Sequence, residues 1–250
     1  MSDLLLNHDD YLESRLFQVQ CDFLIPDRKV ILGALMSNTK LAKRLTDTLQ
    51  STFSPTLFNP WRDDCDDCEP CNGPDAKLNR LAAHLACVPK FILCGEAPSH
   101  RGCRHSGIAF TSECQLLDGR IPRIPKMNHR LTSGDDPYFE RSAKIVWDEL
   151  YKLEIEESTI LWNALQMHPH RPGDPQSNRT PKSAEFEIGK RALRMLVEEF
   201  PSAKVVAVGR KAEGSLNSLK LMGVPAAYVR HPARGGAKEF VKGLERLVRG

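Results

Sequence analysis

The chain has 250 residues, of which 41% are hydrophobic and 27% charged, and 35 Lys and Arg against 32 Asp and Glu give a formal net charge of +3. This composition is typical of a globular protein and excludes a disordered or fibrous chain. No apolar run reaches the roughly 18 residues of a membrane span, and the acidic N-terminus does not resemble a signal peptide. We therefore expect the protein in a reducing cytoplasm, where its 8 cysteines are thiols or metal ligands before they are disulfides.

The predicted elements alternate between helices and buried strands. Apolar residues at helical spacing predict a helix over 34–53, which a Pro-, Asp- and Cys-rich loop separates from a second helix over 75–86. Short apolar runs predict four strands, at 90–95, 158–163, 204–209 and 226–230. Helical patterns fill the intervals and the C-terminus, at 138–152, 182–199, 210–222 and 235–249.

This order predicts an α/β fold, in which a four-stranded parallel sheet lies between helices in a three-layer α/β/α arrangement. We expect a single domain over residues 1–250, with 1–75 as an N-terminal elaboration of a core formed by 76–250. In such sheets the functional residues lie at the carboxyl ends of the strands.

Charge is distributed unevenly along the chain. The formal net charge is −6 over residues 1–75, +2 over 76–200 and +7 over 201–250. The basic C-terminal fifth indicates a surface that faces a polyanion. A solvated helix face with Lys and Arg on it is the alternative interpretation.

The first predicted strand is followed by a loop, GEAPSHRG at 95–102, that contains two glycines and a proline. Such a loop offers exposed backbone amides to a small anion. It is neither a Walker loop, because no Gly-Lys-Ser/Thr follows, nor a dinucleotide fingerprint, because GxGxxG is absent. Phe110 follows shortly, between Gly107 and two hydroxyl residues, and is a candidate for stacking on a flat ligand.

Polar residues also follow the second and the last predicted strands. Asn163 can offer its carbonyl and its amino group to one edge of a ligand. His168 and His170 could face a metal, but the intervening proline and the lack of a third ligand nearby argue against a zinc site there. His231 lies between Arg230 and Arg234, whose positive charges favour a neutral imidazole at pH 7.

Taken together, these motifs resemble the uracil-DNA glycosylase superfamily, nearest the branch whose members often carry an iron–sulfur cluster. The resemblance covers about residues 90–248, in the correct order. It rests on Gly-Glu-Ala-Pro after the first strand, Gly-x-x-Phe, a strand-end Asn leading to Asn-Arg-Thr-Pro, and a late His-Pro loop. It implies a monofunctional DNA glycosylase that flips uracil out of double- or single-stranded DNA and hydrolyses its N-glycosidic bond in base excision repair.

The resemblance also implies roles for individual residues. Phe110 would stack on the extruded uracil, Asn163 would read its N3–H and O4 edge, and His231 would donate to O2 of the leaving uracil anion. Gly95 and Ala97 would complete the uracil pocket, with the catalytic carboxylate of Glu96 near the sugar and the attacking water. The implied DNA contacts come from the strand-end loops and the basic C-terminal fifth: Ser99, His100, Arg101, Arg179, Arg210, Lys211, Arg230 and Arg234.

Three departures from the family pattern alter these expectations. Ala97 stands where other branches have an Asp, so we expect Glu96 to orient the water, with His100 in reserve. The bulky aromatic near Ser99 that excludes thymine elsewhere is missing, and His100 or Arg101 would have to replace it. Ala233 stands where the family has a small polar residue after His-Pro, and Arg234 follows it in the loop at 232–236, where a wedge could fill the gap left by the flipped nucleotide.

The cysteines also depart from the pattern. A Cys-x-x-Cys-x-x-Cys run is present at Cys65, Cys68 and Cys71, but no cysteine follows Cys114. The family position of a third cluster ligand falls at about Met167 or His168. We therefore expect no cofactor and no metal with the family's layout. A local zinc or cluster site remains an open alternative to free thiols, with the ligands Cys65, Cys68, Cys71 and Cys87.

Two other functions stay open from the sequence. The same fold could excise another deaminated base, such as hypoxanthine or xanthine. It could also have lost catalysis and act as a module that binds damaged DNA. In each case we expect a monomer that is associated with the nucleoid and has DNA, not a membrane, as its partner.

Overall fold

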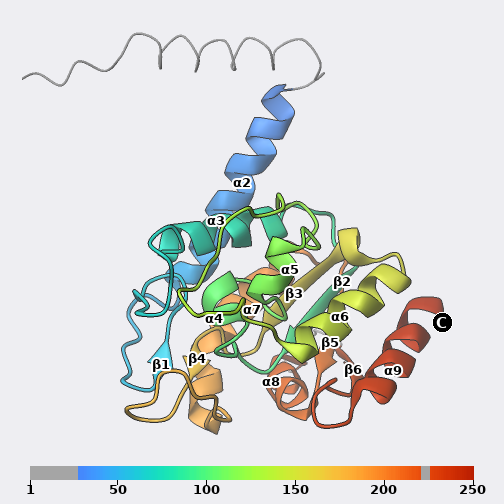
Figure 1. Ribbon diagram of the computed structural model, residues 1–250. Coiled ribbons are helices and arrows are strands. Elements are labelled where there is room, and N and C mark those ends of the chain that lie inside the picture. The colour runs from blue at the N-terminus through green and yellow to red at the C-terminus, as the bar shows by residue number, and fades with distance from the viewer. Residues whose placement is uncertain (1–27, 221–225) are drawn as a thin grey trace, which may run out of the picture. The chain divides into compact units, whose positions relative to one another are not determined.

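A computed structural model describes residues 28–220 and 226–250 of the chain (Figure 1). Residues Asn38–Gly250 form one compact unit, and Met1–Ser37 form a separate one. No helix in the described part of the chain is both long and apolar enough to cross a membrane.

The larger unit is built on a four-stranded parallel sheet in the order β3-β2-β5-β6. The strands are β2 (Phe91–Gly95), β3 (Thr159–Asn163), β5 (Lys204–Val208) and β6 (Ala226–Val229). All four predicted strands are therefore confirmed, together with their parallel direction. They were readable from the sequence because strands buried on both faces give continuous apolar runs.

Helices cover both faces of the sheet, as the three-layer prediction requires (Figure 1). One face packs against the C-terminal part of α2 (Arg28–Asp47), α3 (Pro74–His84), α7 (Phe186–Glu199) and α8 (Arg210–Lys220). The other face packs against α6 (Arg141–Lys152) and α9 (Ala237–Arg249). Side chains alternate along each strand: Ile92 and Cys94 enter the first layer of core, and Phe91 and Leu93 enter the second.

The predicted helices are confirmed, with shifted ends that have local causes. The helix predicted over 34–53 ends at Asp47, where a run of turns begins with the backbone bond from Leu49 N to Thr46 O at 3.0 Å. The helix predicted from 138 begins at Arg141 because Glu140 is extended and serves as its N-cap. A single 3-10 turn, η3 (Ser183–Glu185), precedes α7.

Several short elements were not predicted. The long loop after β2 contains α4 (Cys103–Ser106) and α5 (Glu113–Leu117). A two-residue strand, β1 (Leu57–Phe58), pairs antiparallel with β4 (His168–Pro169). A capping box between Ser112 and Gln115 begins α5, and this pattern is visible in the sequence.

Glu113 fixes the segment that leads from α5 to α6. Its fully buried carboxylate accepts hydrogen bonds from the Arg130 side chain at 2.7 Å, the Thr132 hydroxyl at 2.6 Å and the backbone N–H of Tyr138 at 2.8 Å. Burial acts to raise the pKa of Glu113, but the bonds from Arg130 and Thr132 outweigh it and lower this pKa to about 2. The carboxylate therefore holds residues 130–138 in place.

Candidate active site

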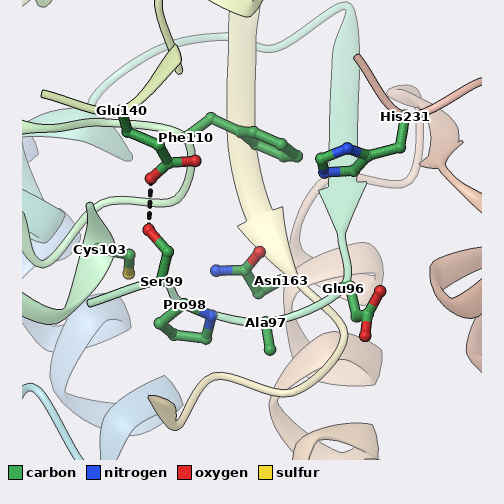
Figure 2. Close-up of a pocket in the computed structure, with 9 residues that line it drawn as sticks. All are labelled: Glu96, Ala97, Pro98, Ser99, Cys103, Phe110, Glu140, Asn163 and His231. Carbon is green, nitrogen blue, oxygen red and sulfur yellow. Dashed lines mark hydrogen bonds between the residues drawn. The ribbon is translucent and has the colours of Figure 1, made fainter. Parts of the chain in front are cut away.

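A pocket opens at the carboxyl ends of β2 and β3, whose last residues, Gly95 and Asn163, are paired in register. Nine side chains line it, as Figure 2 shows: Glu96, Ala97, Pro98, Ser99, Cys103, Phe110, Glu140, Asn163 and His231. Six of them were predicted as site residues from the sequence: Glu96, Ala97, Ser99, Phe110, Asn163 and His231. The structure thus brings four separate motifs to one place.

Gly95 allows the side chains of Phe110 and Asn163 to lie close to the end of β2. A Cβ atom at this position would lie 2.6 Å from Phe110 Cζ and 2.8 Å from Asn163 Oδ1, which is closer than real Cβ contacts allow. Phe110 itself adopts a positive φ of 50°, a conformation that side-chain-bearing residues rarely take. The backbone therefore directs the aromatic ring toward the strand ends at some conformational expense.

Asn163 offers an unused amide to the pocket. The residue is only 5% exposed, and its backbone oxygen accepts a hydrogen bond from Gln166 Nε2 at 2.6 Å. Its side-chain amide has no hydrogen-bond partner among the described residues. A buried amide normally finds partners, so this one is free to donate and to accept at a ligand.

His231 enters the pocket from the loop after β6, with its ring 5.8 Å from the Phe110 ring, centroid to centroid. The backbone N–H of Ala233 donates to His231 Nδ1 at 3.1 Å. In a neutral imidazole the proton then lies on Nε2. Burial, and secondarily the charges of Arg230 and Arg234, lower the pKa of His231 to about 4, so the ring is neutral at pH 7.

Gly209, which follows β5, makes room for this histidine. It has a φ of 96°, and a Cβ atom there would lie 3.0 Å from His231 Cβ. Its N–H donates to Val229 O at 2.9 Å, which ties the end of β5 to the end of β6. The last two strands therefore hold His231 at the pocket.

Glu96 is half-buried at the edge of the pocket. Burial raises the pKa of its carboxyl, against the opposing charges of Lys211 and Arg234. In the view of Figure 2 its carboxylate lies on the His231 side of the pocket, and Ser99 and Glu140 lie on the other.

Pro98, Cys103 and Glu140 were not predicted as lining residues. Glu140 accepts a hydrogen bond from Ser99 Oγ at 2.6 Å, shown dashed in Figure 2, and another from the Ser142 hydroxyl. Ser99 and Glu140 are 41 residues apart, and no local sequence pattern connects them. Burial raises the pKa of the Cys103 thiol, so this thiol stays protonated and lines the pocket as a neutral group.

Two of the predicted DNA contacts are engaged inside the protein instead. His100 is only 4% exposed, and its ring lies against the ring of His105, 5.2 Å away between centroids. Arg179 binds both carboxylate oxygens of Glu185, at 2.7 and 2.8 Å, and also the carbonyl oxygens of Thr56 and His170. Because these side chains are already occupied within the protein, we propose neither as a DNA contact. For the same reason we propose His100 neither as a water-orienting nor as a thymine-excluding residue.

The other predicted cations are at the surface. Arg101, Arg230 and Arg234 are exposed around the pocket loops, and Arg234 has a positive φ of 52°. Arg210 and Lys211 line a second hollow, between α7 and α8, and Arg210 is paired with Glu213 at 2.8 Å. These five remain candidates for contact with a polyanion.

The described cysteines do not gather into a four-sulfur group. Cys65 and Cys68 are joined by a disulfide, with their Cα atoms 5.4 Å apart. Cys71 is exposed, and neither it nor Cys87 belongs to a group of potential metal ligands. The four-cysteine site left open from the sequence is therefore not formed by the described residues, and Cys21 lies outside them.

Two comparisons with known proteins concern the family and the fold of this chain. The model of the Uracil DNA glycosylase superfamily matches residues 84–247. The crystal structure of wild-type SMUG2 from Pedobacter heparinus aligns with a TM-score of 0.58 and 12% identity, over 85% of this chain and 99% of that chain. At this identity the structural likeness concerns the fold. No protein of curated function matches the sequence.

Proposed function

The chain belongs to the uracil DNA glycosylase superfamily, and we propose that it excises uracil from DNA by flipping the base out and hydrolysing its N-glycosidic bond. Family and fold together make it a DNA glycosylase, a hydrolase of N-glycosyl bonds. Beyond this class of enzyme, we propose that the excised base is uracil, that the pocket residues have the roles given below, and that the enzyme does not cleave the DNA strand. Its products are free uracil and an abasic site, as in base excision repair within the cytoplasm.

One observation carries the proposal: an aromatic ring, an unpaired amide and a neutral imidazole line the same pocket. Phe110 supplies a flat apolar surface on which an extruded base stacks. Asn163 supplies a donor and an acceptor on one edge, which fits the O4 and N3–H of uracil. Cytosine reverses this order on the same edge, since its exocyclic amine donates and its N3 accepts.

His231 acts on the other side of the base. Because Ala233 N–H occupies Nδ1, the Nε2 proton is available to donate to O2 of uracil. Cleavage of the bond leaves negative charge on the base, so this donation strengthens toward the transition state. A neutral donor also avoids holding the departing anion as a tight ion pair with an imidazolium.

Glu96 completes the chemistry on the sugar side. Cleavage leaves positive charge on the sugar, which a nearby carboxylate stabilises, and the same group can orient the attacking water. No residue among the nine that line the pocket carries an amine. A covalent Schiff-base step needs such an amine, so a direct attack by water, and hence a monofunctional enzyme, fits this pocket better.

The exposed arginines fit a DNA surface around the pocket. Arg230 and Arg234 flank His231, and Arg101 lies in the loop after β2. Phosphate neutralisation by such residues supplies sequence-independent affinity. This arrangement suits a monomer that scans DNA and inserts a flipped base between its strand-end loops.

The test uses oligonucleotides that each contain one lesion: uracil, hypoxanthine or xanthine, in single-stranded and duplex form. After incubation, alkali cleaves the strand at every abasic site. We expect the wild type to cleave the uracil substrate and the Asn163→Ala variant to lose this cleavage. The matched control Asn217→Ala, which alters an exposed amide on α8, should retain it. Cleavage only at hypoxanthine or xanthine would replace the substrate. Binding of abasic DNA without any cleavage would replace catalysis by damage binding.

A further inference from the structure

A second group of reactive side chains lies outside the pocket, between the cysteine-rich loop and α4. The ligand atoms of Cys65, Cys68 and His105 all lie within 4.8 Å of one another. We propose that Cys65 and Cys68, in their reduced form, bind a zinc ion together with His105. This site is separate from the proposed glycosylase chemistry.

The distances match a tetrahedral site. His105 Nδ1 lies 3.3 Å from Cys68 Sγ and 3.7 Å from Cys65 Sγ. Zinc–sulfur bonds of about 2.3 Å and a zinc–nitrogen bond of about 2.0 Å at a tetrahedral angle separate the two ligand atoms by about 3.5 Å. The histidine is therefore already at ligand distance from both sulfurs, although it lies 37 and 40 residues away along the chain.

The orientation of the His105 ring supports the same conclusion. The ring is fully buried, and its Nε2 lies 3.5 Å from the carboxylate oxygen Oδ2 of Asp67, which also accepts a hydrogen bond from Tyr138 at 3.1 Å. A neutral imidazole carries one proton, and the carboxylate attracts it to Nε2. The lone pair of Nδ1 then faces the sulfurs, and a carboxylate behind a histidine is the usual support of a metal ligand.

Donors around Cys68 suit a thiolate. Asn72 Nδ2 lies 3.7 Å and Lys77 Nζ lies 3.6 Å from Cys68 Sγ. Lys77 is only 1% exposed, so its charge needs a negative partner within the protein. A thiolate provides that negative charge, whereas a disulfide sulfur does not.

An ion can reach the site from an acidic hollow. A pocket beside Cys65 and Cys68 is also lined by the carboxylates of Asp63, Asp64 and Glu69. These carboxylates attract a divalent cation toward the sulfurs. The three protein ligands leave the fourth position of zinc to a water molecule.

The zinc site forms from the disulfide in two steps, reduction and metal binding. A dithiol reductant supplies two electrons and two protons, which convert the Cys65–Cys68 disulfide into two thiols while the dithiol becomes a disulfide. Zinc then replaces the two thiol protons, which are released to solvent. In the zinc-bound form the two sulfurs move apart to about 3.8 Å, the spacing of a tetrahedral site.

The site would fasten the cysteine-rich loop to the wall of the pocket. His105 and Cys103 belong to the same helix α4, and Cys103 lines the pocket. Zinc therefore joins segment 65–68 to the loop that follows β2. The binding is measured by metal content rather than by base excision.

The experiment loads the full-length protein with zinc after reduction by a dithiol, removes free metal by desalting, and measures zinc by mass spectrometry. We expect about one zinc per chain in the wild type, and the same in the control Cys71→Ser, which removes an exposed thiol outside the group. Cys68→Ser should lower the bound zinc at least tenfold, as should oxidation of the wild type before loading.

Cobalt provides a second measurement that does not depend on how any variant folds. The reduced wild type loaded with Co²⁺ should show a thiolate-to-cobalt charge-transfer band, and added zinc should abolish it. The proposal is overturned if the reduced wild type retains no zinc after desalting, if Cys68→Ser retains as much zinc as Cys71→Ser, or if bound cobalt shows no thiolate band.

Discussion

The pocket at the strand ends and the Cys65–Cys68–His105 group both use residues of the loop after β2, but their polar atoms differ in the partners they have. In the pocket, the Asn163 amide is left without a partner and the Nε2 side of His231 is open. In the cysteine group, Nδ1 of His105 faces the sulfurs of Cys65 and Cys68, and its Nε2 lies 3.5 Å from the carboxylate of Asp67. Unpaired groups indicate a site that awaits an organic ligand. Mutually facing ligand atoms indicate a site that holds the chain together.

The two regions also share a support. Glu113 fixes residues 130–138, and Tyr138 at the end of this segment donates to Asp67 behind His105. Two residues later, Glu140 lines the pocket and accepts from Ser99. Substitution of Asn163 or His231 should therefore affect chemistry, whereas substitution of Glu113 should affect stability.

The largest expected effect belongs to Asn163→Ala. Loss of a positioned hydrogen-bonding group at the reacting base should lower the single-turnover rate of uracil excision by about 10²–10³-fold, with little change in thermal stability. Asn163→Asp should shift the preference toward cytosine, because a carboxylate accepts where the amide donated. Wild-type rates in Asn163→Ala would contradict the assignment.

His231→Ala should slow excision about 10²-fold while the affinity for abasic DNA changes much less, because the bond to O2 strengthens only as the base leaves. Its pKa of about 4 lies below the ordinary value of 6.5, so the neutral form is favoured and its contribution to the rate is constant down to about pH 5. The pH–rate profile of the wild type tests whether the contribution of His231 is constant over this range. The profile of Glu96→Gln is measured beside it, because that variant removes the other titrating group, the Glu96 carboxyl. Equal losses of rate and affinity would assign His231 to binding.

Glu113→Gln should lower the free energy of unfolding by about 3 kcal/mol at pH 7. The folded pKa of about 2 lies below the ordinary value of 4.5, so this stabilisation is present above pH 4.5 and is lost as the pH falls toward 2. Urea unfolding of the variant and of the control Glu198→Gln, an exposed carboxylate on α7, should be compared at several pH values. A pH-independent difference would show that the carboxylate charge is not the cause.

The smallest effect is expected for Arg234→Ala. As a wedge, Arg234 would matter for uracil in duplex DNA and little for single strands, which have no stack to reclose. As a phosphate contact it would matter for both, and its loss would reduce the salt slope of binding by about one unit. Excision rates on both substrates at two salt concentrations, with the exposed Lys238→Ala as control, distinguish these roles. Equal losses on both substrates would exclude the wedge.

The sequence predicted the parts of the fold that depend on local patterns. The four strands are continuous apolar runs, and α6 and α7 have apolar residues at helical spacing. The elements α4, β1 and β4 are too short to produce such a pattern, and tertiary contacts determine them. Strand ends likewise predicted Asn163 and His231, because the carboxyl ends of parallel strands meet at one edge, and Phe110 was predicted from its place in a loop between a glycine and two hydroxyl residues.

Other residues of the two sites depend on contacts that no sequence pattern reveals. His100 follows Ser99 directly, yet its side chain turns inward to His105 while Ser99 faces the pocket. Arg179 is neutralised by Glu185, a partner that only the fold brings within reach. The ligand-like approach of His105 to the Cys65–Cys68 pair likewise depends on the conformation of the loop after β2.

Direct detection of the released base tests the central claim. Duplex DNA with a single uracil is incubated with the full-length protein, and free uracil and strand breaks are quantified before and after alkali. We predict one free uracil for each abasic site, with strand breaks only after alkali, and formation of both products about 10²–10³-fold slower in Asn163→Ala. Breaks before alkali would contradict the monofunctional mechanism, and an absence of free uracil from the wild type would contradict the proposed function itself.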